Sequence, residues 1–173
     1  MRSLTLSADD HRIARLTAAA IAIALVESAV PSPLPGVKPG LANIITLLVL
    51  LRYDWATAAW VTLLRVLAVS LLVGQFLAPG FMLSLGGACA ALTVLYVAQP
   101  LARRWPRWFG PVTLSVLSAL AHMMMQLLIV RLWLVPSPGV WVLAPVFIGA
   151  ALLFGTLNGL MVAWLRTPDL ARQ

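Results

Sequence analysis

Apolar positions occur in long runs along the chain, and short polar or proline-rich segments separate them. We predict a helix for each of six runs, which cover residues 13–30, 41–51, 56–74, 81–98, 111–132 and 141–165. A bilayer core about 30 Å thick needs roughly 20 apolar residues per helix, and all runs except 41–51 approach that length. The short run must start deep in the membrane or be helped by the loop before it. The pattern therefore predicts an all-α integral membrane protein with six transmembrane helices, in one domain over residues 1–173.

The segments between the runs carry strong helix-breaking signals. Residues 31–40, PSPLPGVKPG, contain four prolines and two glycines, which excludes a helix through this segment. The first run resembles a signal peptide because it is flanked by basic residues. It ends, however, in Glu27 and the proline cluster, without a clean small-residue cleavage site. We therefore expect it to be a retained transmembrane helix.

The composition supports a membrane protein. Hydrophobic residues make up 62% of the chain and charged residues 10%, and the mean hydropathy is +0.99. Soluble domains are about 45–50% apolar and about 25% charged. This contrast excludes a soluble globular protein and a disordered chain. The single cysteine, Cys89, has no partner, which excludes a disulfide scaffold.

The net charge of +7 is better explained by membrane topology than by nucleic-acid binding, because the basic residues cluster at the ends of the apolar runs. Six spans with a cytoplasmic N-terminus place both termini in the cytoplasm, with nine basic residues inside, two outside and Arg65 within a span. The inner ones are Arg2, Arg12, Arg15, Arg52, Arg103, Arg104, Arg107, Arg166 and Arg172, and the outer ones are Lys38 and Arg131. This bias follows the positive-inside rule and predicts a multi-pass protein of the cytoplasmic (inner) membrane.

Few polar residues lie within or beside the spans, and each is informative because an ionisable group in hydrocarbon is unfavourable. With the topology above, six of them reach the outer half of the bundle. These are Glu27, Lys38, Asn43, Arg65, His122 and Gln126. They lie below the proline- and glycine-rich loop, which predicts a ligand pocket with a lid. We expect Asn158 to lie deeper, toward the cytoplasm.

The six candidates differ in the roles that they suit. Arg65 keeps its charge in hydrocarbon and suits an anionic ligand group. Glu27 either contacts the ligand or only neutralises Arg65 or Lys38. His122 and Gln126 share a helix face and suit either a ligand or a neighbouring helix, whereas Asn43 and Asn158 favour hydrogen bonds between helices.

Small residues form two further patterns. Ala14, Ala18 and Ala22 repeat every four residues in the first run, which would allow another helix to approach closely, although the chain is alanine-rich and coincidence is an alternative. Gly86 and Gly87 would let a ligand or a neighbouring helix approach the backbone.

The sequence lacks the residues of several catalytic classes. It has no phosphate-binding glycine loop ending in Lys-Ser/Thr, so this chain does not hydrolyse ATP, and it has no Cys/His set with metal-ligand spacing. Its few carboxylates do not form the paired aspartates that magnesium-dependent diphosphate chemistry needs. We therefore expect no enzyme activity, no cofactor and no metal.

One long motif resembles a known family. The stretch from Glu27 to Ile44 contains PGVKPGLAN at residues 35–43 and is followed by Leu64-Arg65 and by SLGG at 84–87. Together they resemble the Gx transporter family, which is also known as heptaprenyl diphosphate synthase component I. The resemblance covers nearly the whole chain, and PGVKPGLAN is its most specific part.

That family is similar to the substrate-binding S components of energy-coupling-factor (ECF) vitamin transporters, which are six-helix membrane proteins with a lid loop after the first helix. They dock on a transmembrane coupling subunit through an alanine stripe. The resemblance implies that Ala14, Ala18 and Ala22 form a docking face. It also implies that residues around Glu27, Lys38, Asn43, Arg65 and His122 line the ligand site.

Three hypotheses for the function follow. The first is a membrane subunit that captures a small anionic or polar-headed molecule for uptake, energised by a separate ATPase module. The second is a non-catalytic accessory component of heptaprenyl diphosphate synthesis, and the third is a transporter that works without an ATPase. Partners that co-purify with the protein separate the first two, and transport by the chain alone in liposomes supports the third. None of them involves nucleic acid.

Overall fold

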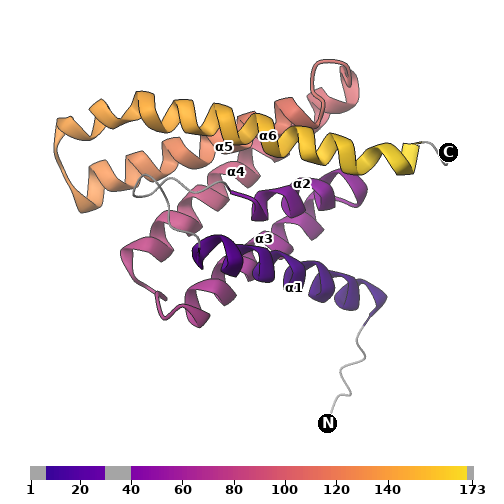
Figure 1. Cartoon of the computed structure of the whole chain (residues 1–173), viewed down its shortest axis with the longest axis horizontal. Coiled ribbons are helices and arrows are strands. Elements are labelled where there is room, and N and C mark those ends of the chain that lie inside the picture. The colour runs from indigo at the N-terminus through magenta and orange to yellow at the C-terminus, as the bar shows by residue number, and fades with distance from the viewer. Residues whose placement is uncertain (1–6, 30–39, 171–173) are drawn as a thin grey trace, which may run out of the picture.

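The computed structural model describes residues 7–29 and 40–170, and every regular element within these ranges is a helix (Figure 1). Two short helices of other types are present, a π-helix at Val130–Leu134 and a 3-10 helix at Pro138–Leu143. The α-helices are α1 (Ala8–Ala29), α2 (Ala42–Arg52), α3 (Trp55–Leu72), α4 (Pro79–Arg104), α5 (Pro111–Ile129) and α6 (Ala144–Leu170). The predicted all-helical fold is confirmed.

Within the described ranges, four segments are long and apolar enough to cross a membrane. They are Trp55–Leu72, Pro79–Arg104, Pro111–Leu134 and Pro138–Arg166. The predicted spans at 13–30 and 41–51 stay predictions, because the described part of α1 carries several charges and α2 has only 11 residues. At 1.5 Å per residue α2 is about 16 Å long, roughly half a bilayer core.

Several helices extend beyond their predicted limits, and prolines are involved in two of these extensions. The prediction ended the fourth helix at residue 98, but α4 continues through Pro100 to Arg104. A proline removes only one backbone donor, and the other carbonyls and N–H groups in an apolar environment have no better partners than their own helix. The last helical segment starts at Pro138, before the predicted residue 141, because proline suits the first turn of a helix.

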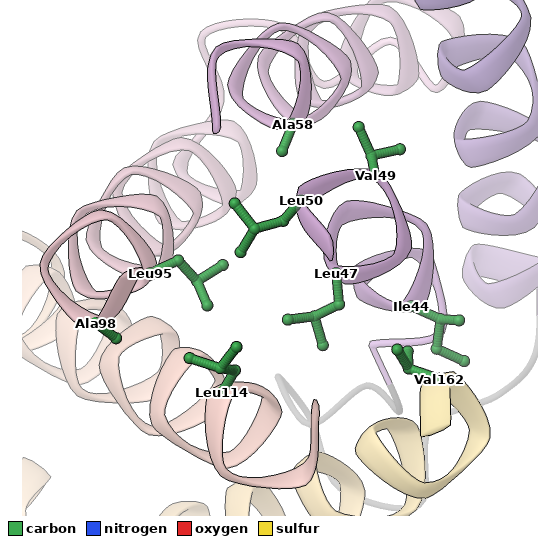
Figure 2. Close-up of a cluster of buried hydrophobic side chains, with 9 residues drawn as sticks. All are labelled: Ile44, Leu47, Val49, Leu50, Ala58, Leu95, Ala98, Leu114 and Val162. Carbon is green, nitrogen blue, oxygen red and sulfur yellow. The ribbon is translucent and has the colours of Figure 1, made fainter. Parts of the chain in front are cut away.

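Helix α2 lies at the centre of the bundle. Leu47 and Val49 are fully buried, and they belong to a hydrophobic cluster to which α2, α3, α4, α5 and α6 all contribute (Figure 2). The members of this cluster are Ile44, Leu47, Val49, Leu50, Ala58, Leu95, Ala98, Leu114 and Val162. The short helix is thus stabilised by burial on several sides, and it needs no full membrane span of its own.

The closest helix packing joins α5 and α6, which run side by side in opposite directions (Figure 1). Two glycines four residues apart on α6 allow it. A Cβ atom at Gly159 would lie 2.5 Å from the Cα of Val112, and one at Gly155 would lie 3.0 Å from the Cα of Val116. Small residues with this spacing let helix backbones touch. The GxxxG pattern is visible in the sequence but was not identified there.

Basic side chains gather at one end of the bundle. The start of α1, the α2–α3 turn, the α4–α5 connection and the end of α6 lie toward that end (Figure 1). Among the described residues it carries Arg12, Arg15, Arg52, Arg103, Arg104, Arg107 and Arg166. At the opposite end, Arg131 follows α5. This distribution agrees with the charge bias that predicts a cytoplasmic location for the basic end.

The α2–α3 turn is fixed by a helix cap, which gives a first prediction. Asp54 accepts a hydrogen bond from the Thr57 backbone N–H (2.8 Å), and the Thr57 hydroxyl donates to it (2.7 Å). These bonds, the side-chain one first, lower the pKa of Asp54. We expect Asp54→Ala to remove about 1 kcal/mol of stability, a shift of about 2–4 °C in the apparent Tm.

The pH dependence of that shift provides the control. Because the folded-state pKa of Asp54 is lowered, the carboxylate stabilises the fold fully above its ordinary value near 3.8, and this contribution is lost as the pH falls through the folded pKa. Thermal unfolding followed by tryptophan fluorescence should therefore separate wild type from Asp54→Ala at pH 7 and bring the two together in acid. A difference that persists at low pH would contradict the cap.

Candidate functional site

The backbone of Gly40, just before α2, is held by side chains of α1 and α6. Glu27 is buried near the end of α1, and its carboxylate accepts a hydrogen bond from the Gly40 N–H. On the other side, the Asn158 amide of α6 donates to the Gly40 carbonyl (3.2 Å). Gly40 has a φ of +70°, a backbone conformation that favours glycine. The end of the proline-rich segment is therefore tied to both α1 and α6.

The position of Asn158 adds it to the polar cluster, from which the sequence had set it apart as a deeper residue. It shares a level with Gly40 and thus belongs to the cluster. The reason is the short α2, which begins partway along α6 rather than at its end (Figure 1). Gly40, which directly precedes α2, therefore lies beside Asn158.

Asn43 connects the start of α2 to α5. Its amide donates to the Ser118 hydroxyl (3.3 Å), and this hydroxyl donates to the Ser115 carbonyl (2.9 Å). Both serines are completely buried, and the Ser115 hydroxyl has no hydrogen-bond partner among the described residues. The expected role of Asn43 in a hydrogen bond between helices is confirmed. The sequence analysis did not predict a role for the two serines, because serine is common in apolar helices and carries no charge that would mark it.

Arg65 brings a positive charge into the middle of α3. Its Nε atom is buried and has no hydrogen-bond partner within the described ranges. The Glu27 carboxylate is near enough to attract it electrostatically, but the two side chains form no ion pair within 4 Å. The guanidinium is consequently only partly compensated by the protein, which is unfavourable unless another group completes its environment.

His122 packs flat against the backbone of α4. A Cβ atom at Gly87 would lie 2.7 Å from His122 Nε2, and one at Gly86 would clash with Ile129. The Gly86-Gly87 pair therefore accommodates side chains of α5. Of the two alternatives from the sequence, a ligand or a neighbouring helix, the structure shows the neighbouring helix at these glycines. Arg65 and His122 are close enough for their charges to interact.

For the remaining predicted residues that it describes, the structure gives burial or exposure but no hydrogen bond within the cluster. Gln126 lies one turn beyond His122 on α5 and is partly buried. Lys38 lies outside the described residues. Ala14, Ala18 and Ala22 are all exposed, while Thr17, Ala20 and Glu27 form the buried face of α1. The alanine stripe thus faces away from the bundle.

Taken together, all six helices contribute to one polar region. The cluster is formed by Glu27, Gly40, Asn43, Arg65, Gly87, Ser118, His122 and Asn158. A further buried hydrogen bond joins the Thr46 hydroxyl of α2 to the Thr62 hydroxyl of α3 (2.8 Å). No group of three or more His, Cys, Asp or Glu side chains suited to a metal exists within the described residues. The cluster offers hydrogen-bond donors and one cation, a combination that suits an anionic or polar group.

Comparison with known proteins assigns the family. A family model described as heptaprenyl diphosphate synthase component I matches residues 16–165. The chain belongs to this family. Its matched range contains every residue of the polar cluster, so the cluster is part of the family domain. The resemblance found in the sequence is confirmed for heptaprenyl diphosphate synthase component I, while the similarity to ECF S components stays a prediction. No curated protein and no solved structure matches the chain.

The hydrogen bond between Glu27 and Gly40 gives a second prediction. Glu27→Ala leaves the Gly40 N–H without its partner, which costs about 1–3 kcal/mol for a buried group and lowers the apparent Tm by several degrees. Glu27→Gln is the matched control, because its amide oxygen still accepts from Gly40. Amide hydrogen exchange at Gly40 should be faster in the alanine variant only. Equal exchange in both variants would mean that the carboxylate does not hold this backbone.

Proposed function

We propose that this protein is the substrate-binding subunit of a membrane transporter, and that it captures a small anionic or polar-headed molecule from the outer side. The observation that carries the proposal is the buried, unpartnered Nε of Arg65 within the polar cluster. A charge in a membrane bundle that lacks a full set of partners is typical of a site for a ligand or an ion. A ligand anion would supply the missing partner.

The segment 30–39 is suited to control access to this cluster. In sequence it connects the end of α1 to Gly40, and the hydrogen bond between Glu27 and Gly40 ties together the residues on its two sides. Asn158 adds a second anchor on α6. Lys38 belongs to this segment and would add a second cation for the bound molecule. We propose that this segment covers the bound molecule, with Asn43, His122 and Gln126 setting its orientation.

Energy for uptake would come from a separate ATPase module, because the sequence has no nucleotide-binding loop. A coupling membrane subunit needs a docking face. The exposed Ala14, Ala18 and Ala22 supply a smooth surface on α1 against which another helix can pack closely. This partner is part of the proposal, as is the cytoplasmic-membrane location.

Native mass spectrometry of the protein extracted from its own membrane tests the binding role. We expect a small molecule bound to wild type and an occupancy at least about 100-fold lower in Arg65→Ala. Arg131→Ala is the matched control, because it removes one arginine near the same end of the bundle but outside the cluster. Retention of the molecule by Arg65→Ala would refute the assigned role.

The family description supports a second candidate, a non-catalytic accessory component of heptaprenyl diphosphate synthesis. In that role the protein would assist a separate synthase or handle its lipid product. Affinity purification from cells distinguishes the two. An ATPase and a coupling membrane protein support the transporter, whereas a soluble prenyl diphosphate synthase supports the accessory component. Uptake in liposomes by this chain alone would instead support a transporter that needs no ATPase.

A further inference from the structure

A second site lies at the basic end of the bundle, remote from the polar cluster. The start of α1 and the α2–α3 turn enclose an open cavity of about 630 Å³, which we call the α1 pocket. It is lined by Ala8, His11, Arg12, Arg15, Leu16 and Tyr53. Five of these residues follow the helical spacing of one face of α1, and Tyr53 closes the pocket from the other side. Its volume lies in the range of small-ligand sites, roughly 300–1,000 Å³.

The two arginines of the pocket differ in their partners. Arg12 is held in place, because it forms an ion pair with Asp9 (2.5 Å) and its guanidinium lies 4.6 Å from the centre of the Tyr53 ring. Arg15 is exposed, and within the described parts of the chain it forms no ion pair. The pocket therefore combines a positioned cation with a second one whose charge is uncompensated.

The carboxylates near the pocket point to other partners than Arg15. Asp9 pairs with Arg12, Asp10 accepts hydrogen bonds from Ser7, and Asp54 caps α3. None of them lines the cavity. The ionisable side chains that line the cavity are therefore basic, and a lining of this kind favours an anion.

The walls of the pocket change from polar to apolar along α1. His11 and Arg15 are exposed, whereas Leu16 packs against the buried cluster around α2. A ligand in this position would meet charge at one side and hydrocarbon at the other, as an amphiphile does. Tyr53 is also half-exposed at this end, which is typical of side chains at the level of lipid headgroups.

We propose that the α1 pocket binds the headgroup of an anionic phospholipid of the cytoplasmic leaflet. A phosphodiester with one negative charge matches the single uncompensated arginine, and arginine binds phosphate oxygens strongly through paired N–H donors. The acyl chains would continue past Leu16 along the bundle. This site is independent of the outer-side ligand, and most of it precedes the range matched by the family model.

Titration of phosphatidylglycerol into the purified full chain in neutral detergent tests this proposal, with native mass spectrometry counting the bound lipid. We expect Arg15→Gln to weaken phosphatidylglycerol binding about fivefold, the effect of one arginine at a lipid surface. Arg103→Gln is the matched control, since it removes an equal charge at the same end outside the pocket, and its affinity should change less than twofold. Arg15 is exposed and unpaired, so its substitution leaves the fold intact.

Phosphatidylcholine and inorganic phosphate complete the experiment. Phosphatidylcholine, whose headgroup carries no net charge, should bind at least fivefold more weakly than phosphatidylglycerol. Inorganic phosphate at millimolar concentration should not displace the lipid, because it lacks the apolar part that reaches Leu16. Equal losses in Arg15→Gln and Arg103→Gln, equal binding of the two lipids, or full displacement by phosphate would each overturn the proposal. None of these outcomes bears on the molecule bound near Arg65.

Discussion

Gly159→Ala is expected to lower the apparent Tm of the protein by about 5–10 °C. The added Cβ would lie 2.5 Å from the Cα of Val112 and 3.2 Å from the Pro111 carbonyl oxygen. These are backbone atoms, so no side-chain rotation relieves the clash, and α5 and α6 must move apart. Overpacking of this kind costs about 1–3 kcal/mol or more, and a separated helix pair also loses its close contacts.

Gly149→Ala is the matched control on the same helix. Nothing lies within 4 Å of a Cβ at this position. Alanine is a better helix former than glycine by about 1 kcal/mol, so this variant should be as stable as wild type or slightly more so. Gly155→Ala should lie between the two, because its nearest backbone contact is 3.0 Å away. Thermal unfolding in detergent, followed by tryptophan fluorescence, measures all three. Equal midpoints for Gly159→Ala and Gly149→Ala would mean that the glycines do not determine the α5–α6 distance.

The α5–α6 contact also illustrates what the sequence could predict. Hydropathy located the four long spans to within a few residues, because the length of an apolar run is set by the bilayer itself. It did not identify which helices pair. The glycines at 155 and 159 carry that information, but a GxxxG pattern names no partner helix until the structure shows Val112 opposite.

The polar cluster was predicted in part for a similar reason. Each intramembrane polar residue could be identified singly, since the unfavourable burial of a charge applies at any position. Their relative depths could not be read from a plan of equal spans. Asn158 was set apart from the other polar residues because nothing in the sequence shows that the short α2 begins beside it, with Gly40 in contact. For the same reason the sequence could not show that the Glu27 carboxylate accepts from the Gly40 N–H rather than forming a close ion pair with Arg65.

Arg65→Met is expected to separate the stability of the protein from its binding function. Methionine keeps an unbranched side chain of similar length and removes the charge. Replacing a poorly compensated buried charge with an apolar residue is often neutral or stabilising, so the apparent Tm should stay unchanged or rise. Occupancy by the molecule that co-purifies with wild type should fall at least 100-fold, because two charge-assisted hydrogen bonds of about 1.5–3 kcal/mol each are lost.

The opposite result follows if Arg65 serves only to neutralise Glu27. In that case Arg65→Met would leave an uncompensated carboxylate in the bundle and lower the apparent Tm, and adding Glu27→Gln would restore it. If Arg65 is held for a ligand, Glu27→Gln adds only the small loss expected from a weaker bond to Gly40, and the two effects are additive. A double-mutant cycle on these residues, measured by both thermal unfolding and ligand occupancy, therefore assigns Arg65 to one role. The distinction depends on the absence of an ion pair within 4 Å, since a tightly bound pair would give strong coupling with either function.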